Sequence, residues 1–600
     1  MHVDKPSKNK IDNEIADLMS FHEVLDSVSS SNLPNGGTRR GSITQMGSRV
    51  LWRKRSESLS SSSEHESTSF LNSDTTRDYG SVTQDSYIQN RRVSLLSLHL
   101  NANGSTPIKA DDDGSLREVE TTMKTEIELL IKSSIPLIAT FLLQYSLTVA
   151  SVFSAGSLGS QELAAVSLSN LLANISSYGI IQGIASSLST LCPQAFGRKD
   201  YEAVGLNALR CYMMLWVMFV PIFIFWYWGS YPLLRAIVPD DELCKLATHY
   251  LRILIYGVPG FMTFEVLKQF LQAQGAFQAS TLVLVICAPL NLLLNFVLVH
   301  DSHIGIGFIG APTAVVITNW LMALMLLYYA YFIQGRQCFC RLSTKVFTNW
   351  KRAITLAAPS VLMIEAEWLA FEILSVASSR FGTASLAAQS VVSTTCVTIY
   401  QIPFAISVAA STRVAWFIGS ASKDAAKKVT RAAFFVAAIF GVFNASILAT
   451  FRYSIASLFS EDPKVIQLAG RVLMVGAIYQ VNDVVSCVTA GILRGQGRQY
   501  IGGWLNLFSY YCVALPVAFL LAFKFRLELF GLWIGMVIAL FFVSVCQSYF
   551  VITSDWESII KMSIEDGMAQ ESGNSLKPAK STSSFVDYNM LSPAISVTSG

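Results

Sequence analysis

The stretch "LGSQELAAVSL" (residues 158–168) returns 223 residues later as "FGTASLAAQSV" (residues 381–391). Each match of this kind is weak alone, but several in the same order at one offset indicate a duplicated chain. Two fainter echoes keep an offset of 222 residues. They are "FGRKD" (196–200) with "IGSASKD" (418–424), and "LQAQG" (271–275) with "LRGQG" (493–497).

The composition places both copies in a membrane. Of 600 residues, 52% are hydrophobic and 14% are charged, whereas ordinary soluble proteins have about 25% charged residues. A hydrocarbon core about 30 Å thick requires about 20 mainly apolar residues per helix. Twelve such runs are present: 131–155, 163–188, 204–229, 243–272, 277–299, 308–334, 352–379, 385–411, 430–451, 465–492, 499–523 and 529–552.

The repeat divides these twelve runs into two halves of six. Because six is even, both halves enter the membrane in the same sense, which relates them by an axis along the membrane normal. We therefore predict an all-α polytopic membrane protein with an N-terminal lobe (126–335), an inter-lobe loop (336–351) and a C-terminal lobe (352–556). Two such lobes enclose a central cavity, and folds of this kind move solutes by rocking one lobe against the other.

The two ends of the chain have a different composition. Residues 1–125 are rich in Ser, Asn, Asp and Arg, and residues 557–600 are similar. Neither segment has enough apolar side chains to offset the entropy of ordering, so we predict two disordered tails. No apolar run precedes residue 125, so we expect the first hydrophobic helix to target the chain to its membrane.

Lysine and arginine are unevenly distributed between the loops. Since basic short loops remain in the cytosol, the loops after even-numbered runs are predicted to be cytosolic, as are both tails. A vacuolar or a plasma membrane is consistent with this orientation. The net charge of +3 gives no sign of nucleic-acid binding. The basic residues of these loops and their flanks are Arg198, Lys199, Arg210, Arg336, Arg341, Lys345, Lys351, Arg352, Arg413, Lys423, Lys427, Lys428, Arg431, Arg494 and Arg498.

Carboxylates inside the predicted helices are candidate functional groups, because an ionised side chain at mid-membrane costs about 2.5–3.5 kcal/mol. At 100° per residue, Glu365 and Glu372 share one helix face, whereas Glu367 points elsewhere, so the three cannot line one narrow cavity. Each acid either carries protons during transport or stays protonated and hydrogen-bonded in a packed interface. The candidates are Glu265, Glu365, Glu367, Glu372 and Asp483.

Aromatic residues in the predicted helices offer a second kind of contact. Trp368, Tyr400 and Tyr479 can stack on an organic cation. The alternative for each is ordinary packing in a protein core or at the membrane interface.

Three stretches together resemble the multidrug and toxic compound extrusion (MATE) transporters. They are "LCPQAFGRKD" (191–200), "EWLAFE" (367–372) and "AGILRGQGRQYIGGWLNL" (490–507). The resemblance extends over residues 126–555 and is greatest to eukaryotic, and among these fungal, members. The residues that carry these motifs are Gln194, Gly197, Arg494, Gly495 and Gly497.

The resemblance implies antiport of organic, often cationic, solutes against protons or sodium ions. In eukaryotic members it implies a proton site in the C-terminal lobe. Here that site falls on Glu367, which precedes Trp368, and on Asp483. The second glutamate of the family motif falls on Glu372.

In the N-terminal lobe the resemblance places a polar pair on Gln144 and Asn174. Bacterial members with a carboxylate in the first helix have Asp where this chain has only Gln144 nearby, so that coupling route is not expected. Glu365 and Glu265 are additional acids without a counterpart in the animal pattern.

We therefore predict a proton-coupled exporter that works by alternating access, with sodium as the other possible coupling ion. One alternative is a lipid flippase of the same two-lobe superfamily. Another is a membrane-embedded acyltransferase, but His249, near a helix end, is the only histidine inside a run. We expect no enzyme activity, cofactor or metal, and a monomer whose partners are small organic solutes and the lipid bilayer.

The N-terminal tail contains three matches to the pattern of basophilic kinases, in which basic residues stand two and three positions before a serine. Serine-rich tails also produce such matches by chance. If the matches are real, the protein is a phosphoprotein, and each phosphate adds about −1.5 to −2 charges. The predicted sites are Ser42, Ser56 and Ser94.

Overall fold

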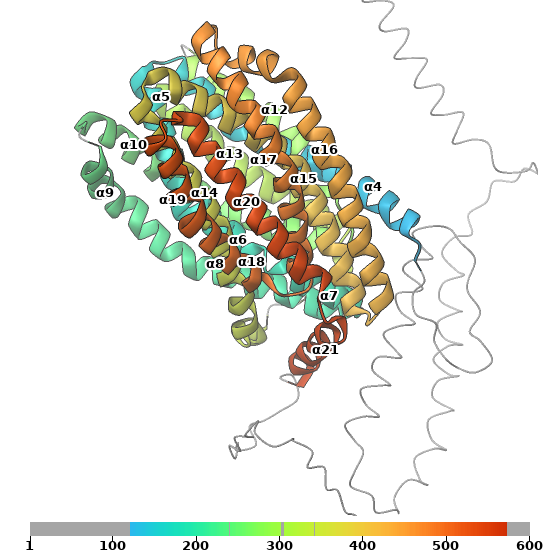
Figure 1. The fold of residues 1–600 in the computed structure, drawn as a ribbon. Coiled ribbons are helices and arrows are strands. Elements are labelled where there is room, and N and C mark those ends of the chain that lie inside the picture. The colour runs from blue at the N-terminus through green and yellow to red at the C-terminus, as the bar shows by residue number, and fades with distance from the viewer. Residues whose placement is uncertain (1–120, 239, 302–304, 341–342, 573–600) are drawn as a thin grey trace, which may run out of the picture. The chain divides into compact units, whose positions relative to one another are not determined.

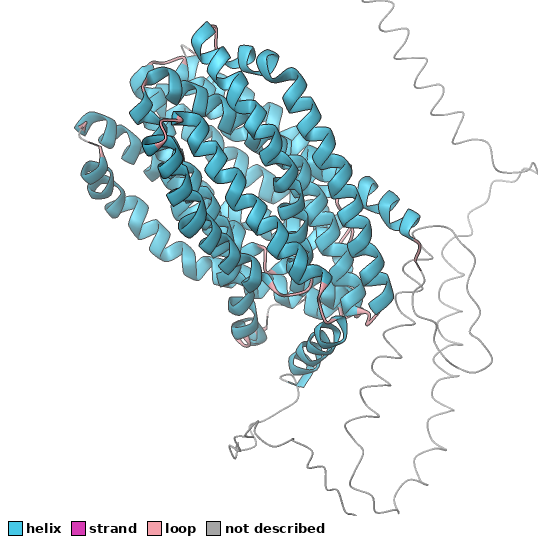
Figure 2. Ribbon diagram, viewed as in Figure 1, coloured by secondary structure: helices cyan, strands magenta, loops and turns pink. Residues whose placement is uncertain are grey.

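A computed structural model describes residues 121–238, 240–301, 305–340 and 343–572. All regular elements of this part of the chain are helices (Figures 1 and 2). The first half contains α4 (Met123–Gly156), α5 (Ser160–Ala173), α6 (Gly179–Ala185), α7 (Leu188–Gly197), α8 (Tyr201–Ile224), α9 (Ser230–Ile237), α10 (Asp241–Leu254), α11 (Val258–Ala273), α12 (Gln278–His300) and α13 (Gly310–Tyr328). The second half contains α14 (Trp350–Ser378), α15 (Thr383–Gly419), α16 (Lys423–Phe459), α17 (Pro463–Gly495), α18 (Gln499–Phe508), α19 (Leu515–Phe519), α20 (Glu528–Ile552) and α21 (Trp556–Ser572).

The described helices correspond to the twelve predicted runs. Eleven helical stretches of the described residues are long and apolar enough to cross a membrane, and several are assembled from shorter helices, as α5 to α7 are over Ser160–Gly197. The twelfth predicted run, 352–379, is the single helix α14, which carries the three glutamates. The prediction of an all-helical membrane fold is confirmed.

Aspartates set the start of several helices. The side chain of Asp200 accepts a hydrogen bond from the backbone of Ala203 at the start of α8, and Asp462 accepts one from Lys464 at the start of α17. Such caps satisfy backbone N–H groups that have no partner inside the helix. The acids of these loops therefore define helix ends.

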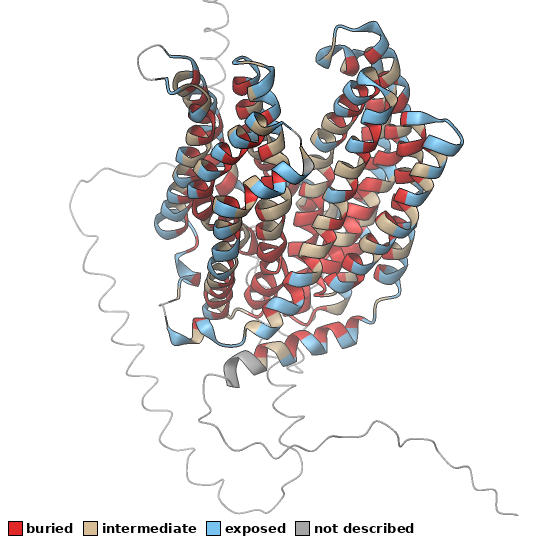
Figure 3. Ribbon diagram, turned by 90° about the vertical axis from the view of Figure 1, so that its left-hand side faces the viewer, coloured by how far each residue is buried: buried red, intermediate tan, exposed pale blue. Residues whose placement is uncertain are grey.

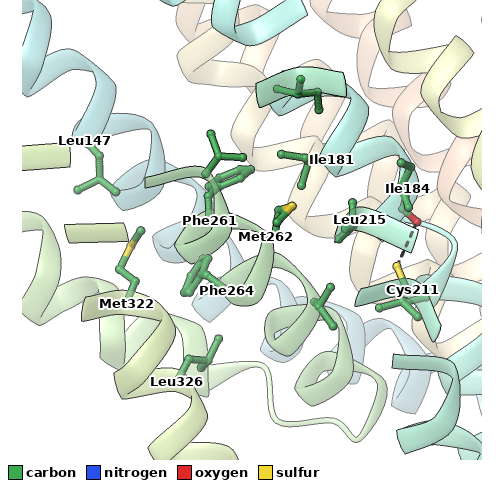
Figure 4. Packing of buried hydrophobic residues seen from close by; sticks show 14 of the residues in the cluster. Leu147, Ile181, Ile184, Cys211, Leu215, Phe261, Met262, Phe264, Met322 and Leu326 are labelled. Carbon is green, nitrogen blue, oxygen red and sulfur yellow. Dashed lines mark hydrogen bonds between the residues drawn. The ribbon is translucent and has the colours of Figure 1, made fainter. Parts of the chain in front are cut away.

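Each lobe has a tightly packed interior. In the N-terminal lobe, Ile181, Leu215 and Met262 come from three different helices and pack together, and the Cys211 thiol donates to the Ile184 carbonyl at 3.7 Å (Figure 4). In the C-terminal lobe, the fully buried Trp533 donates from Nε1 to Gln389 Oε1 at 2.7 Å. Many apolar side chains on the outer helix faces are instead exposed (Figure 3), as expected for surfaces that face lipid.

The two lobes meet along a seam at the end of the bundle where α4 begins and α20 ends, which we call the tail-side end. Gln194 of α7 donates from Nε2 to the Gly495 carbonyl at 3.0 Å, and Trp416 of α15 donates from Nε1 to the Ala273 carbonyl at 2.8 Å. Gln194 and Trp416 are separated by the 222-residue offset of the repeat, as are Ala273 and Gly495. The seam is therefore built from equivalent contacts of the two halves.

Two glycines, also 222 residues apart, allow this close approach. A Cβ on Gly197 would overlap the Trp416 carbonyl oxygen, and a Cβ on Gly419 would overlap the Gln194 carbonyl oxygen. Backbones at this separation leave no space for a side chain. The repeat "FGRKD" and "IGSASKD" thus marks the points where α7 and α15 touch.

A buried ion pair adds to the contact between lobes. Glu126, near the start of α4, accepts from Arg413 of α15, with its two oxygens 2.7 and 2.8 Å from Nη2 and Oε2 also 3.1 Å from Nε. The Glu126 carboxylate is fully buried and the Arg413 guanidinium nearly so. Breaking a buried pair exposes each charge to a low dielectric, so this contact favours a closed seam.

The C-terminal segment differs from the prediction. Residues 557–600 were expected to be disordered, but Trp556–Ser572 form α21, which lies at the tail-side end (Figures 1 and 3). Ile559, Ile560 and Ile564 are buried on one face of this helix. One amphipathic face is enough to anchor a short helix in an otherwise polar segment, which overall composition does not reveal.

Contacts of α21 extend to both lobes. Arg198, which follows α7, donates from Nη1 to the backbone and side-chain oxygens of Ser563 at 3.2 Å each. Arg352 of α14 pairs with Asp566 at 2.9 Å. Helix α21 therefore bridges the seam. The other tail boundary also shifts slightly, since α4 begins at Met123 and not after residue 125.

Candidate functional site

A cavity of about 50 Å³ lies inside the C-terminal lobe. It is formed by α14, α15, α17, α18 and α20, and this volume has room for a few water molecules. Four of the predicted site residues meet there: Glu367, Tyr400, Asp483 and Arg494. The remaining lining residues are Met363, Ile364, Phe404, Ser486, Cys487, Ala490, Asn506 and Leu540.

The two acids of this cavity come from different helices. Glu367 projects from α14 and Asp483 from α17, and Asp483 is only 3% exposed. Its Oδ2 atom is buried without a hydrogen-bond partner among the described residues. A buried carboxylate oxygen without a donor is costly, and a proton or a bound cation removes that cost. The site is therefore suited to exchange one for the other.

The walls of the cavity are aromatic and basic. Tyr400 stacks on Phe404 with ring centroids 5.8 Å apart, and the guanidinium of Arg494 lies 5.7 Å from the Phe404 ring. Arg494 Nη2 also donates to Ser407 Oγ at 2.7 Å. Aromatic faces attract organic cations, so this wall suits the ligand class that two carboxylates favour.

Other predicted residues lie elsewhere. Tyr479, expected in the cavity wall, instead packs in an aromatic core with Phe371 and Trp533, at centroid distances of 6.1 and 5.6 Å. Trp368 and Glu372 belong to α14, but they are not among the residues that line this cavity. The helix face explains the difference, because only one side of α14 is turned toward α17.

The N-terminal lobe holds a separate polar cluster. Glu265 Oε1 accepts from Lys268 Nζ at 2.6 Å and from Gln144 Nε2 at 2.8 Å, and Lys268 also donates to Gln144 Oε1 at 3.1 Å. Glu265 and Lys268 are almost completely buried. The sequence analysis considered Glu265 but overlooked Lys268, although a lysine three residues after a glutamate in one helix predicts this pair. Asn174 begins a π-helical turn, Asn174–Tyr178, in the same lobe.

We expect Lys268→Met to destabilise the protein by about 3–5 kcal/mol, because Glu265 remains as an unpaired buried charge. Thermal unfolding in detergent, followed by tryptophan fluorescence, measures this. The double variant Glu265→Gln, Lys268→Met is expected to recover most of the loss, because it leaves no charge behind. If the double variant were as unstable as the single one, the loss would come from packing and not from charge.

The motif residues connect the cavity to the seam. Thr190 of α7 donates to the Arg494 carbonyl at 2.5 Å, across the lobes, while the Arg494 side chain lines the cavity. Gly497 has φ +73°, a left-handed conformation that side chains disfavour, and lets the chain turn into α18. The motif "RGQG" thus serves both the acid site and the contact between lobes.

Comparison with known proteins agrees with this arrangement. The family model MatE matches residues 136–297 and 359–520, one match in each lobe. An uncharacterized transporter of Saccharomyces cerevisiae is 42% identical over 78% of this chain and 68% of its own length. Protein DETOXIFICATION 17 of Arabidopsis thaliana is 32% identical over 74% of this chain and 94% of its own.

Solved structures show the same fold. The crystal structure of the eukaryotic MATE transporter AtDTX14 superposes with a TM-score of 0.70 at 27% sequence identity. The match covers 74% of this chain and 99% of that one. The chain belongs to the MatE family of multi-pass membrane transporters, with the family's repeated domain present once in each lobe.

Proposed function

We propose that this transporter is a secondary active antiporter that exports organic, mainly cationic, solutes in exchange for protons. The observation that carries the proposal is the cavity in which Glu367 and Asp483 come together against an aromatic wall. A proton and an organic cation compete for such a site, because each neutralises the same carboxylates. Competition of this kind is what links the two flows.

Alternating access provides the movement. The seam joins the lobes through a few hydrogen bonds and the Glu126–Arg413 pair, and rocking of one lobe breaks these together. The tail-side end carries most of the basic loop residues, so we place it in the cytosol. In this orientation the structure is closed toward the cytosol, and acid on the far side drives export.

Phosphorylation of the N-terminal tail by protein kinases is part of the proposal. Ser42, Ser56 and Ser94 lie outside the described residues. Added negative charge weakens the attraction of a basic tail to an anionic leaflet. A vacuolar or plasma membrane, each acidic on its far side, fits the proposed direction of export.

Reconstitution tests the proposed function. Purified protein in liposomes is supplied with a fluorescent organic cation and either a pH gradient or a sodium gradient of equal size. We expect accumulation with the pH gradient alone. Accumulation with sodium alone would replace the proposed coupling ion, and movement of lipid without any gradient dependence would favour a flippase.

A further inference from the structure

Glu365 lies outside the acid cavity, on the seam between the lobes. It projects from α14 toward α6, where a Cβ on Gly179 would overlap its Oε1 atom. One turn closer to the tail-side end, a Cβ on Gly183 would lie only 2.5 Å from Val361 Cα. The Glu365 carboxyl group is thus held against the backbone of the opposite lobe at a place where the two helices touch.

This contact leaves part of the carboxyl group unsatisfied. Oε1 is buried and has no hydrogen-bond partner among the described residues. A Gly179 Cα presents no polar hydrogen to it. The ionised form therefore loses hydration without compensation, whereas the neutral form loses much less.

The groups around Glu365 do not offer a cation. Residues 174–185, which include α6, contain one titratable side chain, Tyr178, and its ring packs on Trp226 and Phe261. From the segment after α18, Tyr511 interacts electrostatically with Glu365. The titratable groups nearest along α14 itself are the acids Glu367 and Glu372. All of these neighbours are neutral or acidic, so they do not stabilise an ionised Glu365.

We propose that Glu365 is a second proton-binding residue, which links the protonation of α14 to closure of the seam. When the seam closes, the carboxyl group is sealed against Gly179 and holds a proton. When the lobes part at the tail-side end, water reaches the group and the proton leaves. By linkage, proton binding and seam closure then favour each other.

This inference rests on the alternating access of the proposed function and gives it a direction. Acid on the far side favours the closed seam, and a neutral cytosol favours release of the proton after opening. Glu365 contacts neither the cavity lining nor the solute there. It therefore acts as a positioning residue for the conformational step.

The distance between the lobes tests this directly. Labels are introduced in the full-length protein through bio-orthogonal amino acids at positions 202 and 424, which are exposed and start equivalent regions of α8 and α16. Their separation is measured by pulsed spin-resonance spectroscopy in lipid nanodiscs between about pH 6 and pH 8. We expect the wild type to shift toward the short distance at low pH, by up to about tenfold in population per pH unit for each linked proton.

Glu365→Gln is expected to favour the short distance throughout and to lose most of this pH dependence, because the amide imitates the neutral acid. Gly179→Ala keeps the acid but displaces it from the seam, so it is expected to favour the long distance. Glu461→Gln, an exposed acid in the loop before α17, is the matched control and is expected to titrate as the wild type. A pH response of Glu365→Gln equal to that of the wild type would overturn the inference, as would one of Gly179→Ala if Glu365→Gln did not fold.

The same samples separate this inference from the proposed function. If liposomes show proton-coupled solute flux but the lobe distance responds to pH without Glu365, the inference fails and the function stands. If the distance depends on Glu365 but no solute is exchanged for protons, the proposed function fails and the inference stands.

Discussion

Replacing Glu367 by glutamine is expected to abolish accumulation driven by a pH gradient. Glu367 lines the cavity together with Asp483, and the amide keeps the shape of the side chain but cannot exchange a proton. One pH unit supplies about 1.4 kcal/mol per proton, which supports up to about tenfold accumulation. The variant should bring the accumulation ratio close to one while the protein still reaches the membrane.

Uptake of a fluorescent organic cation into proteoliposomes measures this ratio across a series of pH gradients. Asp483→Asn is expected to behave in the same way, because both charges are needed for the competition. Glu461→Gln provides the control, since it removes a glutamate that is exposed and distant from the cavity. Near-normal accumulation by Glu367→Gln would exclude this residue from the coupling mechanism.

Replacing Gly197 by leucine is expected to remove nearly all transport by preventing the tail-side end from closing. The added side chain would collide with the Trp416 carbonyl, which is backbone and cannot rotate away. The hydrogen bond from Gln194 to Gly495 lies within the same turn of α7 and would be lost with it. Gly419→Leu should have the same effect, because the repeat makes the two positions equivalent.

The measurement for these glycine variants is the initial rate of solute exchange at saturating substrate, together with the 202–424 distance. A low rate with a long distance is expected. Gly441→Ala is the matched control, since its nearest neighbours would lie 3.6 Å from the new Cβ, an ordinary contact. Normal exchange by Gly197→Leu would show that closure of this seam is not part of the cycle.

The fold was predictable because it depends on two signals that are local and additive. Apolar runs of membrane length mark the spans, and a repeated offset pairs the halves, so neither requires knowledge of side-chain contacts. Helix α21 escaped prediction because a few isoleucines on one face, such as Ile559 and Ile564, decide its docking. The contacts that hold it come from Arg198 and Arg352, far away in the sequence.

The candidate site was predictable only in part. A carboxylate in an apolar run signals cost, and this singled out Glu367 and Asp483 correctly as residues of one cavity. The same signal did not distinguish them from Glu265, whose charge is met by Lys268. Aromatic residues carry no comparable cost, so the sequence could not separate Tyr400, in the wall, from Tyr479, in a packed core.

Counter-movement of protons is the most direct test of the whole account. Proteoliposomes that contain a pH-sensitive dye, with equal pH on both sides, receive an organic cation on one side only. We predict that protons leave the opposite compartment as the cation enters, at a rate that saturates with cation, and that Glu367→Gln abolishes this flow. Entry of the cation with no movement of protons would contradict the account.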